Sequence, residues 1–184
     1  MTSKNATVLM SGGIDSTACA HFLHSAGFSV RGLFIDYGQA ARSAEARAVQ
    51  AAAQHLACQV TSVSVLLGRE FAAGELTGRN AFLISTALFA GISRPGVLAI
   101  GIHAGTPYFD CSEAFFEAIA RLVSEQTDGT VTLIAPFLNW TKGDVFNYFT
   151  ASQLPVSVTY SCESGGEEPC GLCASCRDRE ALGC

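Results

Sequence analysis

The stretch that decides the fold is ATVLMSGGIDST, at residues 6–17. Its apolar, partly β-branched beginning predicts a buried strand, and the chain from Asp15 to Ala26 has the apolar spacing of a helix. Two glycines between them free backbone N–H groups to converge, and the start of the helix adds its positive end. The stretch therefore predicts an anion-binding turn. The alternative is a plain glycine turn before a helix that Ser or Asp caps.

Strand-like and helix-like segments alternate along the rest of the chain. Apolar runs predict five strands, at residues 6–10, 30–37, 60–66, 96–103 and 131–137. Helical spacing of apolar residues predicts helices at residues 15–26, 39–56, 80–92, 112–125 and 141–150. This alternation is typical of an α/β fold with a doubly wound, mostly parallel five-stranded sheet, in which ligands bind at the carboxyl ends of the strands. We therefore expect residues 1–184 to form a single domain.

Composition limits the classes of partner. The net charge of −5 is opposite to the basic footprint of a nucleic-acid-binding surface, although a local loop can still bind a small nucleotide. No apolar stretch approaches about 18 uninterrupted residues, and the N-terminus has no signal-peptide architecture. We therefore expect a cytoplasmic protein that binds neither nucleic acid nor a membrane.

The tail of the chain holds half of the eight cysteines, namely Cys162, Cys170, Cys173 and Cys176. Thiolates at this spacing favour a tetrahedral Zn²⁺ site in a C-terminal segment at 159–184, with Gly171 letting backbone N–H groups point at sulfur. An iron–sulfur cluster also takes four thiolates and is the alternative. Arg177 and Arg179 either balance the thiolate charge or lie on the surface. The scattered cysteines, interpreted as small apolar residues, are Cys19, Cys58, Cys111 and Cys184.

The turn at Ser11–Ser16 is neither a Walker A loop nor a Gly-x-Gly-x-x-Gly turn. It reads SGGIDS and resembles the signature of the PP-loop ATP pyrophosphatases, which have an adenine nucleotide alpha hydrolase-like fold. The resemblance implies that the loop holds the pyrophosphate of ATP while a substrate oxygen attacks the α-phosphate, and that Mg²⁺ spreads the charge. It implies ATP binding by the loop and the second strand, through Ser11, Gly12, Gly13, Ile14, Asp15, Ser16, Thr17, Phe34 and Tyr37.

Further blocks follow in order along the chain: DYGQ (36–39), GRN (78–80), YFDC (108–111), WTK (140–142), TYSC (159–162) and PCGLCASCRDR (169–179). Together with the loop they resemble the QueC family of 7-cyano-7-deazaguanine synthases. The resemblance implies that ATP activates the carboxylate of 7-carboxy-7-deazaguanine, that ammonia converts it to an amide, and that a second activation gives the nitrile. The residues expected to carry this catalysis are Asp15, Arg79 and Lys142.

Two basic residues and a neighbouring amide are candidates for binding phosphate or the substrate acid. Arg79 lies at the start of a predicted helix, where its fork suits a phosphate or a carboxylate. Lys142 lies at another helix start and suits a phosphate. The alternative for both cations is a solvated surface position, and the alternative for Asn80 is a helix cap.

The residues after the fourth predicted strand are candidates for binding the base. Asp110 can accept from the N–H edge of a guanine-like ring, and Tyr108 or Phe109 can stack on its face. His103 is a candidate proton carrier, although a lone histidine at a strand end is more often structural.

The chain departs from the family pattern on this substrate side. Only Glu75-Leu76-Thr77 precedes the GRN block, where family members carry a longer loop, and residues 103–107 differ. Ser112 stands where those enzymes usually have arginine. An open site would suit a larger acceptor than ammonia, such as a protein amino group joined by a QueC-like paralogue of a bacterial defence system.

Two other classes of function are alternatives. One is a non-catalytic nucleotide- and zinc-binding interaction module, which would have less need of the loop together with both cations. The other is a sulfur-transferring PP-loop enzyme acting on tRNA, which the acidic charge disfavours. The partners expected are therefore ATP and a deazapurine acid. A homodimer is compatible with the sequence.

Overall fold

A single parallel sheet forms the centre of the computed structural model, which describes residues 4–66, 68–72, 74–92 and 95–184. Its strands are β1 (Asn5–Leu9), β2 (Ser29–Asp36), β3 (Gln59–Ser64), β4 (Gly96–Ala99) and β5 (Val131–Ile134). They lie in the order β3-β2-β1-β4-β5, and every neighbouring pair is parallel. The predicted α/β class with a doubly wound five-stranded sheet is therefore confirmed.

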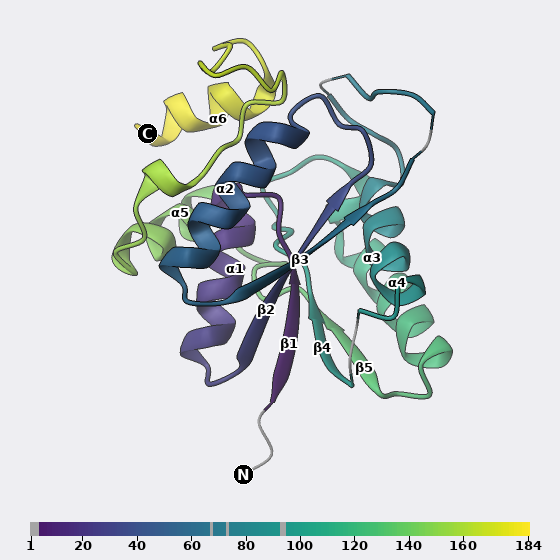
Figure 1. Cartoon of the computed structure of the whole chain (residues 1–184). Coiled ribbons are helices and arrows are strands. Elements are labelled where there is room, and N and C mark those ends of the chain that lie inside the picture. Colours follow the sequence, from purple (N-terminus) through teal and green to yellow (C-terminus); the bar gives the residue numbers. More distant parts are fainter. Residues whose placement is uncertain (1–3, 67, 73, 93–94) are drawn as a thin grey trace.

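Helices cover both faces of the sheet (Figure 1). One face carries α1 (Ile14–Ser25), α2 (Arg42–His55) and α5 (Lys142–Ala151), and the other carries α3 (Arg79–Phe89) and α4 (Glu113–Gln126). The last helix, α6 (Ala174–Leu182), lies beyond the carboxyl ends of the strands. Two short 3₁₀ turns are η1 (Phe109–Cys111) and η2 (Val156–Val158).

Alternating side chains of the central strand divide the core into two layers. Val8 packs with Ala18 and Phe137 on the face of α1 and α5, whereas Leu9 packs with Ile84 on the face of α3. Successive side chains of a strand point to opposite faces, so a strand that is buried on both faces reads as a continuous apolar run. This is the physical reason why ATVL predicts a central strand.

The fourth and fifth strands are shorter than the sequence indicates. The expected strand at 96–103 ends at Ala99, and the one at 131–137 ends at Ile134. The amide of Ile100 still donates to the carbonyl of Ile134 (3.1 Å), but the chain after residue 134 turns and leaves no partner strand. Residues 100–103 therefore leave the sheet at its carboxyl edge. The sequence predicted only a metal-binding segment at residues 159–184 and did not predict helix α6.

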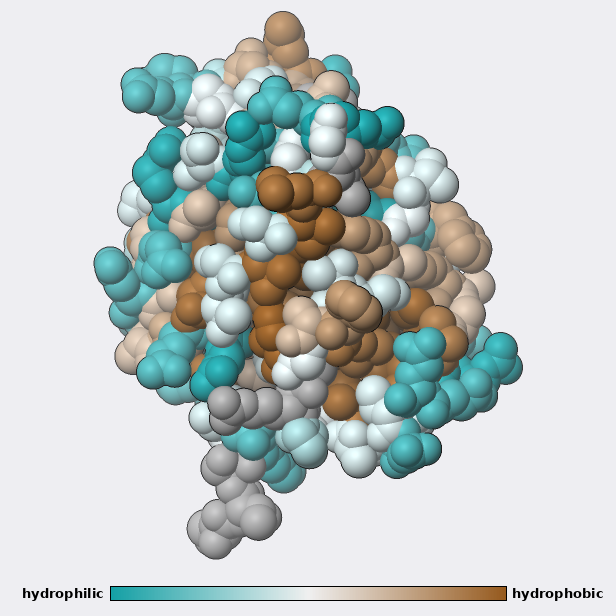
Figure 2. All heavy atoms as spheres, turned by 45° about the vertical axis from the view of Figure 1, so that its right-hand side comes forward, coloured by the Kyte–Doolittle hydropathy of each residue, from teal (hydrophilic) through white to brown (hydrophobic). Residues whose placement is uncertain are grey.

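Apolar side chains remain on the outside of the α3 and α4 layer. Figure 2 shows this side of the molecule, with apolar side chains gathered across it. Phe89 at the end of α3 is 97% exposed, and Leu122 on α4 is 43% exposed. A homodimer stays a prediction. No helix that the structure describes is long and apolar enough to cross a bilayer.

The first glycine of the anion-binding turn is needed for packing. Gly12 has a φ of +78°, and a Cβ at this position would lie 2.7 Å from the Cβ of Ala48 and 2.9 Å from the carbonyl oxygen of Glu45, both on α2. The turn can therefore approach α2 only without a side chain.

We predict that Gly12→Ala destabilises the fold more than a matched control. Gly27 has a φ of +83°, and a Cβ added there would meet no atom within 4 Å, so Gly27→Ala carries only the backbone strain, about 1–2 kcal/mol. Gly12→Ala adds overpacking against α2, which costs about 1–3 kcal/mol more. Urea unfolding of both variants measures the difference. Equal losses in the two variants would show that α2 does not constrain the turn.

Candidate functional site

A cavity of about 280 Å³ opens at the carboxyl edge of the sheet. Its walls come from the ends of β1, β2 and β4, the start of α3, and the C-terminal segment. The crossovers from β1 and β3 run to opposite sides of the sheet, so β1 and β4 flank the point where the strand order reverses. Open α/β sheets bind their ligands in the crevice at such a point.

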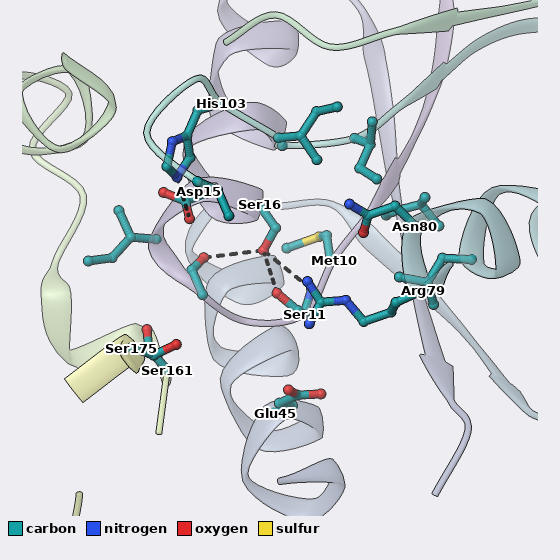
Figure 3. Close-up of a pocket in the computed structure, with 18 of the residues that line it drawn as sticks. Met10, Ser11, Asp15, Ser16, Glu45, Arg79, Asn80, His103, Ser161 and Ser175 are labelled. Carbon is teal, nitrogen blue, oxygen red and sulfur yellow. Dashed lines mark hydrogen bonds and ion pairs between the residues drawn. The ribbon is translucent and has the colours of Figure 1, made fainter. Parts of the chain in front are cut away.

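The loop after β1 is ordered by its own hydrogen bonds. The amide of Ser11 donates to Oγ of Ser16 (3.3 Å), which in turn donates to the carbonyl of Gly13 (3.2 Å). Figure 3 shows these bonds at the centre of the cavity. The loop residues that line the cavity are Ser11, Gly13, Ile14, Asp15 and Ser16. Gly12 and Thr17, which the sequence also proposed for ATP binding, are buried and do not line it.

Two further polar side chains meet Asp15, the second residue of α1. Oδ2 of Asp15 lies 3.0 Å from Nζ of Lys142, at the start of α5, and 3.7 Å from Nε2 of His103. Burial alone would raise the pKa of Asp15, but the hydrogen bond with His103 and the charge of Lys142 outweigh it and hold this pKa below its ordinary value. Asp15 is therefore a carboxylate at neutral pH.

The second oxygen of Asp15 is buried without a partner. Oδ1 has no hydrogen bond to any described residue, and a buried carboxylate oxygen without a partner is costly. An anionic oxygen facing a phosphate loop is the ligand that Mg²⁺ prefers. The residue present therefore fits a magnesium ion.

His103 is fixed in place and holds Asp15. The amide of Gly105 donates to its Nδ1 (3.0 Å), so the hydrogen-bond network assigns the proton of the neutral ring to Nε2, on the side of Asp15. The ring is buried. This arrangement favours a role in orienting Asp15 over the proposed role of a mobile proton carrier.

The opposite wall carries Arg79 and Asn80, as Figure 3 shows, with Arg79 extending toward Ser11. The Arg79 cation also interacts with Tyr37 and Glu45. Burial raises the pKa of both of these groups, and Arg79 offsets part of that rise. The guanidinium group of Arg79 thus lies between the loop on one side and Tyr37 and Glu45 on the other, where a phosphate or a substrate carboxylate can reach it.

Three residues proposed for base binding lie outside the cavity lining. Phe109 is 72% exposed and packs edge-on against Phe115, and Tyr108 is absent from the lining as well. Asp110 is buried, and its Oδ2 accepts from the amide of Asn80 (3.1 Å). Its carboxylate therefore caps the start of α3 and is not available to the base in this structure.

The neighbouring cysteine lines the cavity instead. Burial raises the pKa of Cys111 to about 11, helped by the adjacent Asp110 carboxylate. The thiol is therefore protonated and forms a small apolar part of the wall. Ser112, whose departure from the family pattern suggested an altered acceptor site, caps α4 by accepting from the amide of Phe115 (3.2 Å) and does not line the cavity.

The four cysteines of the tail converge. The sulfur atoms of Cys162, Cys170, Cys173 and Cys176 all lie within 4.8 Å of one another. Ligands about 2.3 Å from a single tetrahedral ion are about 3.8 Å apart, whereas four thiolates on different irons of a cluster need wider spacing. The site therefore fits one ion better than a cluster.

Backbone amides support the sulfur atoms of this site. The amides of Leu172 and Cys173 donate to Sγ of Cys170 (3.5 and 3.4 Å), across Gly171, whose φ is +69°. A hydrogen bond from Ser164 and these two amides lower the pKa of Cys170 to about 6. The thiolate form of Cys170, which is the form that binds a metal, is thus favoured at neutral pH.

The sequence did not indicate that this segment also forms a wall of the cavity. The amide of Tyr160 donates to the carbonyl of Gly12 (2.9 Å), which joins the segment to the loop. Arg179 donates to Thr159 and to Ser161. The residues that the segment adds to the lining are Tyr160, Ser161, Glu163, Ser175, Asp178, Arg179 and Leu182. Most of them lie in the blocks TYSC (159–162) and PCGLCASCRDR (169–179), but nothing in the sequence indicates that these blocks face a loop about 150 residues earlier in the chain.

Comparison with known proteins gives one family. The model for "Queuosine biosynthesis protein QueC" matches residues 5–78 and 70–182. The chain is 32% identical over 207 residues to the 7-cyano-7-deazaguanine synthase of Halobacterium salinarum, covering 97% of this chain and 90% of the relative. It is 31% identical over 212 residues to that of Parasynechococcus marenigrum, covering 98% and 93%. Both alignments are longer than the 184 residues of this chain, so the chain carries gaps in them.

Solved structures share the fold at low sequence identity. The U34-tRNA thiolase NcsA from Methanococcus maripaludis with its [4Fe-4S] cluster has a TM-score of 0.58 at 14% identity, covering 100% of this chain and 65% of the thiolase. The NMN synthetase from Francisella tularensis has a TM-score of 0.55 at 14% identity, covering 90% of this chain and 69% of the synthetase. These likenesses show the fold alone.

Proposed function

Because the chain belongs to the QueC family, we propose that it is an ATP-dependent ligase that activates the carboxylate of 7-carboxy-7-deazaguanine and converts it to an amide and then to the nitrile, 7-cyano-7-deazaguanine. Relatives that match nearly their whole length to this chain carry the name of that synthase. The single observation that carries the proposal is the contact between Asp15 and Lys142 beside the ordered loop. A phosphate chain needs a cation and convergent amides in this arrangement.

The loop and α1 are assigned to the phosphates of ATP. The amides from Ser11 to Asp15 start α1, so its positive end faces the cavity. Lys142 pairs with Asp15 in the structure and lies close enough to exchange this partner for a phosphate oxygen. Phe34 and Tyr37, at the end of β2, line the part of the cavity assigned to adenosine. Mg²⁺, when bound, would neutralise phosphate charge, and Oδ1 of Asp15 is the atom that fits it.

The first reaction is acyl transfer through an adenylate. An oxygen of the substrate carboxylate attacks the α-phosphorus of ATP. The bond from this phosphorus to the oxygen that bridges the α- and β-phosphates breaks, and pyrophosphate leaves. Ammonia then attacks the acyl carbon, AMP leaves with the carboxyl oxygen, and the nitrogen loses a proton. Arg79 faces the loop and is assigned to the developing charge of this acid and its phosphate.

The second reaction removes water from the amide. The amide oxygen attacks the α-phosphorus of a second ATP, again with loss of pyrophosphate. Loss of AMP with that oxygen and of the two N–H protons leaves the nitrile. Buried side chains that line the cavity, such as those of Cys111 and Ile102, exclude water, which would otherwise hydrolyse the adenylate.

A larger amine is the second candidate acceptor. The observation that favours it is the shortness of the chain relative to the synthases, whose alignments are longer than 184 residues. Ser112 gives it no support, because this side chain caps a helix away from the cavity. A protein amino group would use the same adenylate as ammonia does.

Product analysis tests the proposed reaction. With ATP, Mg²⁺, 7-carboxy-7-deazaguanine and ammonia, we expect AMP, pyrophosphate, and the amide and nitrile by mass spectrometry. Asp15→Asn should lower the rate at least a hundredfold, because it removes the charge that holds Lys142 and the metal ligand. Asp128→Asn, an exposed change of the same kind, is the control.

Three outcomes distinguish the alternatives. An adenylate that forms without the amide would favour the larger acceptor. Absence of AMP and pyrophosphate with every acid tested would favour the binding module. Full turnover by Asp15→Asn would remove Asp15 from the mechanism.

Zinc in the four-cysteine site is a separate prediction. We expect about one zinc ion per chain, and we expect Cys170→Ser to lose zinc and to expose residues 159–184 to limited proteolysis, because structural zinc contributes folding free energy. Cys184→Ser is the control, since Cys184 is an exposed cysteine outside the cluster. Iron with visible absorbance, or a chain that holds no metal, would contradict the assignment.

A further inference from the structure

We propose that Glu163, carried by the four-cysteine segment, is the carboxylate that binds the N–H edge of the deazapurine base. This assignment rests on the proposed function and names the residue that selects its substrate. It replaces Asp110, whose carboxylate caps α3 outside the cavity lining.

The chemistry of the base sets what this residue must be. A guanine-like ring presents a ring N–H and an exocyclic amino group side by side, and both are donors. One carboxylate oxygen has two lone pairs and can accept from both donors, and charge-assisted hydrogen bonds of this kind are the strong ones. The site therefore needs a cavity carboxylate that is free to accept.

Four carboxylates line the cavity among the described residues, and three of them are engaged elsewhere. Asp15 holds Lys142 and His103 at the loop. Asp178 faces Lys142 at 3.8 Å and is 55% exposed. Glu45 accepts from Gln39 (2.8 Å) and interacts with Arg79 on the β2 side.

Glu163 is fixed in position while keeping free acceptor capacity. Its Oε1 accepts from the amide of Ser175 (3.1 Å) and from the hydroxyl of Ser175 (2.9 Å). Among the described residues no hydrogen bond is formed at Oε2. A side chain held by one oxygen presents the other at little further cost in entropy, which favours binding.

The position of Glu163 relative to the loop also suits the base. The acid group to be activated and the N–H edge lie at opposite ends of the bicyclic ring. The loop forms one wall of the cavity, and the C-terminal segment that carries Glu163 and Ser175 forms another. A base that spans between these walls places its acid at the phosphates and its donors at Glu163.

Substrate discrimination tests this assignment. Glu163→Gln keeps an oxygen for Ser175 but presents an amide to the base, so the KM for 7-carboxy-7-deazaguanine should rise about ten- to a hundredfold, with the KM for ATP unchanged. An analogue without the exocyclic amino group should be a poorer substrate than the parent acid for the wild-type protein and should lose that disadvantage in Glu163→Gln. Glu167→Gln, an exposed change on the same segment outside the cavity lining, is the control. Zinc content of each variant checks that the segment is intact.

The outcomes separate this assignment from the proposed function. If the wild-type protein releases no pyrophosphate with the acid, both are overturned. If it does so but treats the analogue like the parent acid, or if Glu163→Gln keeps the wild-type preference, only the assignment of Glu163 is overturned. The wild-type comparison can overturn the assignment even if the variant fails to fold.

Discussion

The contact between Asp15 and Lys142 is the interaction on which the site depends. It joins the first turn of α1 to the first turn of α5, two helix starts that are 127 residues apart in the chain. Its Nζ–Oδ2 distance is 3.0 Å, and both side chains are about 30% exposed. Leaving either the carboxylate of Asp15 or the ammonium group of Lys142 unpaired in that position would cost free energy. The ion pair therefore keeps both side chains charged beside the loop. Under the proposed function, a phosphate of ATP then replaces Asp15 as the partner of Lys142.

The sheet brings this pair together, and the C-terminal segment completes the cavity around it. Parallel strands place the loop after β1 and the chain after β4 at one edge, where Nε2 of His103 lies 3.7 Å from Oδ2 of Asp15. The amide of Tyr160 then ties the segment to Gly12 of the same loop. Under the proposed function the cysteines have a role beyond stability. A zinc ion bound by them would hold the wall that carries Glu163 and Ser175.

The sequence predicted the parts that depend on local pattern. The five strands, the helix that follows each of them and the loop follow from apolar spacing and glycine chemistry, and the four cysteines converge as their spacing indicates. It did not indicate which side chains the long-range contacts engage. Asp110 was proposed for the base because it follows a strand; in the structure its Oδ2 accepts from the amide of Asn80, and its role toward the base stays a prediction. Asp178 lies in the block PCGLCASCRDR (169–179) but had no role assigned to it, and Glu163 lies outside the blocks, since only the folded tail brings both to the cavity.

A crystal structure with an ATP analogue whose α,β-phosphate bond cannot be cleaved, Mg²⁺ and 7-carboxy-7-deazaguanine tests the central claim most directly. We expect phosphate oxygens on the amides of Ser11–Ser16, Lys142 moved from Asp15 onto a phosphate, and the acid group beside the α-phosphorus. A nucleotide bound elsewhere, with the contact between Asp15 and Lys142 intact and the loop vacant, would contradict it.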